Sequence, residues 1–202
     1  ATSEANWTVA SAFARIAEAH RNDDKGFSFL DDRGELRRHY PFPELYQRAH
    51  DRARQLMGLG LRKGDRVGLV LPEGEDFILS FLAATIAGLA PVPMFPPLSL
   101  GKLEAYLETA RNILTASRSR MLLTSRKVQN VMWGLVDDVK GLERVVCVEE
   151  LDAMPLNGYG LPELAPEDIA FIQFTSGSTA APKGVVVTHK SLGANLHGIM
   201  EH

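Results

Sequence analysis

The sequence has 202 residues, which is enough for one domain and part of a second. Hydrophobic residues make up 45% and charged residues 23%, and 22 basic against 25 acidic residues give a net charge of -3. The basic residues are interleaved with acids, which argues against a nucleic-acid binder. Six histidines and one cysteine form no recognisable metal-ligand pattern, and a single cysteine fits a reducing, cytoplasmic location. We therefore expect an ordinary cytoplasmic globular protein.

One stretch reaches the length of a membrane span, because residues 77–95 are 19 residues without a charge. Pro91 and Pro93 lie inside this stretch and Gly88 precedes them. A buried helix, a glycine stop and a buried strand explain the same residues, so we expect no membrane span. The N-terminal residues lack the charged-then-apolar pattern of a signal peptide, and secretion is not expected.

The first elements in chain order are two helices around a hairpin. Apolar residues at helical spacing predict a helix over residues 10–19. Residues 27–38 alternate around a turn that contains Gly34, which predicts a β-hairpin. Residues 43–57 have one apolar face at the helical period and predict a second, amphipathic helix.

Short apolar strands then alternate with longer helical segments. This pattern is typical of a parallel sheet with helices on both faces, and we predict an α/β fold with a doubly wound, mostly parallel sheet and flanking helices. The predicted strands are residues 67–71, 90–94, 121–124 and 144–148, and the predicted helices are residues 73–87, 102–116 and 127–136.

A proline- and glycine-rich stretch follows, over residues 154–166. Such a composition predicts an exposed connection. We therefore divide the chain into an N-terminal α/β subdomain over residues 1–153, a connection over residues 154–168, and a loop-bearing segment over residues 169–202 that begins a further subdomain and is cut off at its end.

Two apolar strands are predicted in the last segment, over residues 169–174 and 184–187, with a polar loop between them. A helix is predicted from about Lys190 onward. Thr188 or Ser191 is the expected N-cap, because their hydroxyls can accept from the first backbone N–H groups of a helix.

The polar loop has the residue types that bind phosphate. Gly177 lets backbone N–H groups approach an anion closely, and Lys183 supplies a positive charge. A Walker A loop is excluded, because no Gly-Lys-Ser/Thr follows at the required spacing and a strand follows the loop. On composition alone, a phosphate cradle and an ordinary polar hairpin loop both remain open. The four hydroxyls that can donate to phosphate oxygens belong to Thr175, Ser176, Ser178 and Thr179.

The whole string is more specific than its composition. Thr-Ser-Gly-Ser-Thr at 175–179 with Pro-Lys-Gly at 182–184 resembles the signature loop of the adenylate-forming superfamily. That superfamily contains acyl-CoA synthetases, peptide-synthetase adenylation domains, luciferases and fatty acyl-AMP ligases. The sequence departs at Ala180, where the family usually has glycine, and alanine would cost about 1 kcal/mol if the loop needs a positive φ there. Gln173-Phe174 before the loop, and the proline-rich residues 91–97, are similar to the fatty acyl-AMP ligase branch.

The resemblance implies an ATP-dependent acid ligase that uses Mg2+. The parent enzyme would convert a fatty acid and ATP to acyl-AMP and pyrophosphate, mainly by positioning and by charge neutralisation. It would then pass the acyl group to the phosphopantetheine of an acyl carrier protein or of a polyketide or peptide synthase. By resemblance, the ATP phosphates are bound by Thr175, Ser176, Gly177, Ser178 and Thr179, with Lys183 as counter-charge.

No catalytic residue and no metal ligand can be assigned in this chain. The adenine pocket, the magnesium ligand and the catalytic lysine of relatives come after the loop, so the 202 residues alone are not expected to catalyse adenylation. Two alternatives remain: an acyl-CoA synthetase or peptide-synthetase adenylation domain, and a non-catalytic α/β binding module. Acyl chain length, acceptor, pathway and oligomeric state cannot be read from these residues.

Two further side chains are expected to have structural roles. Cys147 lies in an apolar run and is expected to be a buried thiol rather than a nucleophile. His189 follows the second strand of the loop-bearing segment, and we expect it to serve helix entry or packing.

Overall fold

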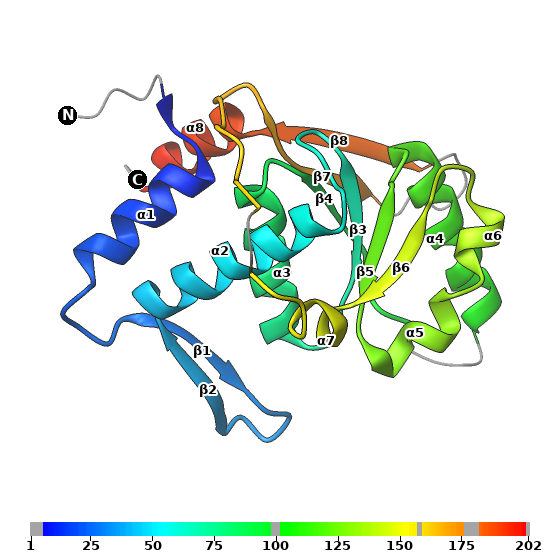
Figure 1. The fold of residues 1–202 in the computed structure, drawn as a ribbon, viewed down its shortest axis with the longest axis horizontal. Coiled ribbons are helices and arrows are strands. Elements are labelled where there is room, and N and C mark those ends of the chain that lie inside the picture. Colours follow the sequence, from blue (N-terminus) through cyan, green and yellow to red (C-terminus); the bar gives the residue numbers. More distant parts are fainter. Residues whose placement is uncertain (1–5, 98–101, 157–158, 176–181, 201–202) are drawn as a thin grey trace.

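The computed structural model describes residues 6–97, 102–156, 159–175 and 182–200 (Figure 1). The predicted N-terminal elements are confirmed. Thr8 and Ser11 cap the first helix reciprocally, each backbone N–H donating to the other's hydroxyl at 3.0 and 3.1 Å. Gly34, at φ 80°, takes the tight turn of the hairpin. The elements are α1 (Val9–Ala19), β1 (Gly26–Leu30), β2 (Leu36–Pro41) and α2 (Phe42–Gly58).

Four parallel strands form the central sheet, in the order β4-β3-β5-β6. Val67 of β3 lies opposite Pro91 on one side and Met121 on the other, so the chain winds outward from β3 in both directions. This confirms the predicted doubly wound α/β fold. The strands are β3 (Arg66–Val70), β4 (Ala90–Pro93), β5 (Met121–Thr124) and β6 (Arg144–Cys147), connected in part by α3 (Gly74–Ile86) and α4 (Leu103–Ser117).

Alternate strand residues build two separate cores, one on each face of the sheet. Leu69 and Leu123 are buried against α2 and α3. Leu122 is buried against α4 and the helices that follow β5. Figure 1 shows these two sets of helices on opposite sides of the strands. Burial on both faces explains why the strands are continuous apolar runs without polar alternation.

Two predictions about the segment after β5 were wrong. The helix predicted over residues 127–136 is two helices, α5 (Arg126–Met132) and α6 (Leu135–Asp138). Gly134 lies at the break, and glycine is unfavourable inside a helix. The strand predicted to end at Val148 ends one residue earlier, and a short helix, α7 (Val148–Leu151), begins there. Four residues are too few to show a helical period.

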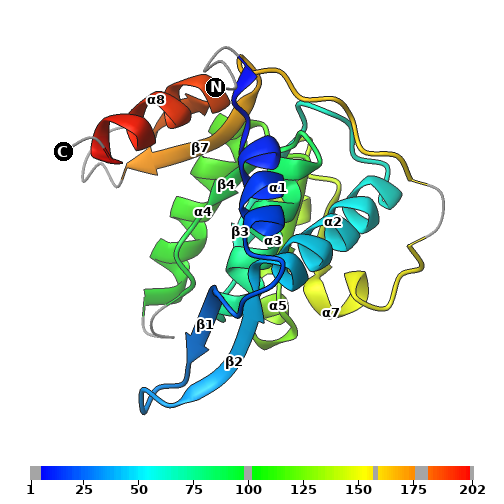
Figure 2. The same cartoon turned by 90° about the vertical axis from the view of Figure 1, so that its left-hand side faces the viewer.

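The loop-bearing segment has the predicted order of strand, loop, strand and helix. Antiparallel β7 (Ile169–Thr175) and β8 (Lys183–Thr188) precede α8 (His189–Met200). Thr188 is the N-cap, because its Oγ1 accepts from Ser191 N at 3.1 Å. Ile172 of β7 packs with Ala90 and Val92 of β4, and Figure 2 shows β7 next to β4 at the edge of the sheet.

The division at residues 153 and 168 stays a prediction. None of the helices in the described ranges combines the length and apolar character that a bilayer crossing requires. The uncharged residues 77–95 are instead divided between α3, a turn and β4, as predicted.

Candidate functional site

The two described ends of the predicted phosphate loop lie side by side. Thr175 is the last residue of β7 and Lys183 the first of β8, and the two are paired across the hairpin. Both are exposed. Residues 176–181, which include Ser176, Gly177, Ser178, Thr179 and Ala180, lie outside the described residues, so the phosphate-binding role of the loop stays a prediction. The strands that frame it are confirmed.

Gly184, the last residue of the loop motif, has a packing reason for lacking a side chain. A Cβ there would lie 2.8 Å from the ring of Phe174 and 3.1 Å from Cγ2 of Ile172. The Phe174 ring therefore lies over the place where a β8 side chain would begin. Sequence reasoning assigned this glycine only by resemblance, and the structure adds that it lets the aromatic ring of β7 pack beside the loop.

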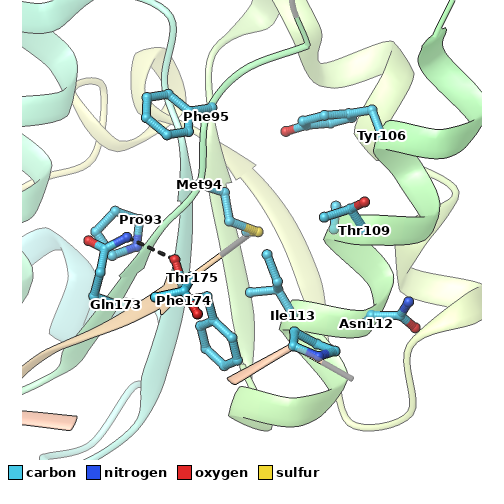
Figure 3. Close-up of a pocket in the computed structure, with 12 residues that line it drawn as sticks. Pro93, Met94, Phe95, Tyr106, Thr109, Asn112, Ile113, Gln173, Phe174 and Thr175 are labelled. Atoms are coloured by element: carbon cyan, nitrogen blue, oxygen red, sulfur yellow. Dashed lines mark hydrogen bonds between the residues drawn. The ribbon is translucent and has the colours of Figure 1, made fainter. Parts of the chain in front are cut away.

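A cavity of about 630 Å³ lies beside Thr175, between the end of β4, α4 and the loop end of the β7–β8 hairpin (Figure 3). This volume is in the usual range for small-molecule sites, about 300–1,000 Å³. Its walls are mainly apolar, and the residues from Pro93 to Phe95, at and just after the end of β4, contribute one of them. The apolar walls include Met94, Phe95, Ile113 and Phe174.

Tyr106 of α4 lines this cavity. Its hydroxyl is buried and has no hydrogen-bond partner among the described residues. Burial raises the pKa of this phenol well above its usual value near 10, so the hydroxyl stays protonated. Sequence patterns did not reveal this position, because Tyr106 is one residue of an ordinary amphipathic helix and the cavity forms only when α4 meets β4 and β7.

A second polar site lies where the sheet order changes direction, between β3 and β5, a place where ligands bind in many doubly wound folds. Glu73 at the start of α3 accepts from Arg37 at 2.6 Å and pairs with Lys127. The hydrogen bonds from Lys127 and Arg37 hold the pKa of Glu73 below its usual value. Glu73 is thus committed to ion pairs within the protein.

Cys147 is fully buried at the end of β6, as expected. Burial raises its pKa to about 11, so the thiolate that a nucleophile requires is not populated at neutral pH. The expectation of a structural thiol is confirmed.

His189 begins α8 and is fully buried, so the expected packing role is confirmed. Its Nδ1 accepts a hydrogen bond from the backbone N–H of Val9 at 3.1 Å. The proton of the neutral ring is then on Nε2, which is buried without a partner among the described residues. Burial lowers the pKa of His189, while the carboxylate of Asp168 raises it and the charge of Lys63 lowers it further.

The residues before α1 and the start of α8 are therefore joined, which sequence patterns did not reveal. Trp7 adds a second contact, because a Cβ on Gly193 of α8 would lie 2.8 Å from its indole ring. Figures 1 and 2 both show the start of α1 beside α8. Through this contact the N-terminal residues support the helix that directly follows the loop hairpin.

Comparison with known proteins decides the family. Residues 15–202 match the model of the AMP-binding enzymes. The chain belongs to the AMP-binding enzyme family. A candidate acyl-CoA synthetase of Caulobacter vibrioides is 35% identical over 177 residues, which are 87% of this chain and 30% of that protein.

Solved AMP-binding enzymes agree with this assignment. A structure from a study of fatty acyl-adenylate ligases of E. coli and L. pneumophila has a TM-score of 0.87 and 30% identity, over 97% of this chain and 34% of the other. The L. pneumophila fatty acyl-adenylate ligase in complex with acyl adenylate and pyrophosphate has a TM-score of 0.80 and 29% identity, over 99% of this chain and 33% of the other. This chain thus spans about a third of the length of the relatives it matches.

Proposed function

We propose that the protein containing these residues is a fatty acyl-AMP ligase. A carboxylate oxygen of the fatty acid attacks the α-phosphorus of ATP, the bond to the β-phosphate bridging oxygen breaks, and acyl-AMP and pyrophosphate form. The observation that carries the proposal is the signature loop, which begins and ends on two paired strands next to an apolar cavity. The similarity to fatty acyl-adenylate ligases supports it.

The loop residues have the proposed task of holding the ATP phosphates. Thr175 to Thr179 donate hydroxyl and backbone N–H groups, and Lys183 neutralises charge from the start of β8. Mg2+ bound to the phosphates would offset further negative charge, and no described residue is proposed as its ligand. Because phosphoryl-centred reactions depend on positioning and charge, the loss of one such group slows them strongly.

The cavity beside Thr175 is the proposed binding site for the acid. Its apolar walls suit an alkyl chain, since removal of apolar surface from water contributes about 25 cal/mol per Å². A chain lying over Ile113 and Met94 would leave its carboxylate near the loop.

Lys183→Ala tests the loop assignment in the protein at its full length. We expect ATP–pyrophosphate exchange with fatty acid and Mg2+ to fall about 100-fold. Lys190→Ala is the matched control, because Lys190 is an exposed lysine of α8 whose side chain is 72% accessible. Equal exchange rates for both variants would contradict the phosphate role of Lys183.

The acceptor is proposed to be a phosphopantetheine thiol of a carrier protein or of a polyketide or peptide synthase. Supplying the full-length protein with fatty acid, ATP and either coenzyme A or a phosphopantetheine-bearing carrier separates the branches. Acyl transfer to the carrier is expected. Rapid formation of acyl-CoA would instead assign the protein to the acyl-CoA synthetases, to which the Caulobacter relative points.

We also propose that residues 1–202 do not catalyse the exchange alone, because the resemblance assigns them only the phosphate loop among the motifs of the reaction. Exchange by these residues in isolation would contradict this. If the full-length protein catalysed no exchange with fatty, aryl or amino acids, the non-catalytic binding module would be the better assignment.

A further inference from the structure

His189 lies at the base of the hairpin that carries the phosphate loop, where segments distant in the chain meet. Its backbone N–H donates to the carbonyl of Asp168 at 3.1 Å, which ties the start of α8 to the residue before β7. Its Nδ1 accepts from the backbone N–H of Val9 at 3.1 Å. We call residues 6–9 the N-terminal tether, because they lie beside α8 at this point (Figure 2). One residue therefore joins the tether, the connection and the helix after the hairpin.

The bond to Val9 exists only while the imidazole of His189 is neutral. A neutral ring has one nitrogen without a proton, which can accept a hydrogen bond, whereas an imidazolium has a proton on both nitrogens and can only donate. Protonation would therefore place the Nδ1–H of His189 against the N–H of Val9, and an attraction would become a repulsion between two donors. Nε2 is buried, so water does not solvate a charged ring while the tether stays in place.

The charged groups around His189 do not compensate an imidazolium. Burial lowers the pKa of His189, Asp168 raises it, and the positive charge of Lys63 lowers it further. The carboxylate of Asp168 is already paired with Lys63 at 2.7 Å. Residues 6–11, in the tether and the first turn of α1, contain no titratable side chain. The other charged side chains described at this base form an exposed pair, Lys190 of α8 and Glu167 before β7.

Release of the tether can be local, because α1 is anchored separately. Phe13 of α1 is buried in the main core, and its ring packs edge-on against that of Tyr46 with 5.5 Å between the centroids. The tether meets α8 through Trp7, since a Cβ on Gly193 would lie 2.8 Å from the indole ring. Most of the described residues of α8 after His189 are exposed, so the tether provides part of the cover that this helix has.

We propose that His189 is a pH-sensitive latch at the base of the loop hairpin: the neutral ring holds the N-terminal tether on α8, and protonation of the ring releases it. His189 is thereby a positioning residue, which acts on the hairpin through the start of α8. The proposal goes beyond the proposed function, because the latch is a conformational property of the chain whatever acid the protein activates.

Hydrogen exchange measures the latch in the full-length protein without an activity assay. Deuterium uptake of residues 6–12 is followed by mass spectrometry at pH 7.5 and 5.5 and corrected for the intrinsic exchange rates. The released ring has a pKa of about 6.5 and the latched ring a lower one, so acid favours release, with about 10-fold as the limit over this interval. We expect protection of the Val9 amide to fall by more than about threefold, while β5 stays protected.

His189→Asn tests the residue itself, because asparagine keeps an acceptor for Val9 but does not titrate. The pH dependence of the tether should disappear in this variant, whether its protection is high or low. His20→Asn is the matched control, since His20 ends α1 and bonds to Asp23 at 2.9 Å, away from the latch. This control should keep the wild-type fall in protection.

Three results would overturn the latch. They are a wild-type fall of less than about threefold, a fall that survives in His189→Asn, and a fall that β5 shares, which would indicate global unfolding. These outcomes are separable from those of the proposed function. An absence of ATP–pyrophosphate exchange would refute the ligase and leave the latch standing, and a tether insensitive to pH would refute the latch and leave the ligase standing.

Discussion

Arg52 and Asp152 form an ion pair whose two members are buried very differently, and this asymmetry predicts an unusual pair of mutant stabilities. The Arg52 side chain is 6% exposed on α2, while that of Asp152 is 57% exposed after α7. The guanidinium donates to both carboxylate oxygens of Asp152, at 2.9 and 3.1 Å, and to Ser80 Oγ at 3.0 Å. Asp152 therefore offsets a charge that is otherwise cut off from water.

Removal of the exposed Asp152 is predicted to lower the free energy of unfolding more than removal of the buried Arg52. Asp152→Ala leaves a buried guanidinium whose remaining acidic partner among the described residues is the carboxylate of Asp76, at 3.8 Å. Loss of one partner of a buried pair costs about 3–5 kcal/mol, and Asp76 places this case near about 3 kcal/mol. Arg52→Met keeps an unbranched apolar side chain in the core and leaves Asp152 in water, but the buried Ser80 hydroxyl loses its donor. We therefore expect a loss of about 1–2 kcal/mol, still below that of Asp152→Ala.

Urea unfolding followed by circular dichroism measures these free energies. The double variant is expected to match Arg52→Met alone, since Asp152 has no charge to offset once the arginine is gone. Glu18→Ala is the control, because it breaks a surface pair with Arg21 whose members are 71% and 64% exposed, and it should change stability by less than about 0.5 kcal/mol. The reasoning would be refuted if Asp152→Ala changed the free energy of unfolding by less than about 0.5 kcal/mol. It would also be refuted if Arg52→Met lowered that free energy as much as Asp152→Ala does.

Two further predictions concern the tether to α8 and the turn before β4. Burial depresses the pKa of His189 below the unfolded value of about 6.5, so the unfolded chain binds more protons at acidic pH. The free energy of unfolding therefore falls as the pH drops below about 6.5, by up to about 1.4 kcal/mol per pH unit. His189→Asn keeps an acceptor for Val9 without a titrating ring, so urea unfolding at pH 7.5 and 5.5 should show a smaller loss; an unchanged loss would contradict the assignment. Gly88→Ala should destabilise the protein more than Gly34→Ala. Both residues have a positive φ, at which alanine costs about 1 kcal/mol. A Cβ on Gly88 would also lie 2.9 Å from Leu164, whereas a Cβ on Gly34 would have no atom within 4 Å. Thermal unfolding compares the two variants, and equal melting temperatures would show that the contact is relieved at no cost.

The architecture was largely readable from the sequence because each strand has a continuous apolar pattern and each long helix a clear period. The strand over residues 121–124 was predicted with its observed bounds. The break at Gly134 and the short helix after Cys147 were missed, since four-residue helices have no period to detect.

The cavity was beyond sequence reasoning for a different reason. Met94 after β4, Tyr106 of α4 and Phe174 of β7 belong to different segments, and only tertiary packing brings them together. The contact between Val9 and His189 has the same origin. The family was recognised from the loop motif at residues 175–184, and the match to the AMP-binding enzymes confirms it. Hydrophobic patterns alone do not identify a family.

The hairpin that carries the loop occupies an outlying position in the fold, and this has a consequence for local opening. β5 is bonded to a strand on each side and buried on both faces. Among the described strands β8 is bonded only to β7, and its Val185 and Val186 are 55% and 54% exposed. In this chain, backbone amides of β5 should exchange with deuterium only through global unfolding, and those of β8 through smaller openings. The β7–β8 hairpin can thus open locally without disturbing the strands at the centre of the sheet.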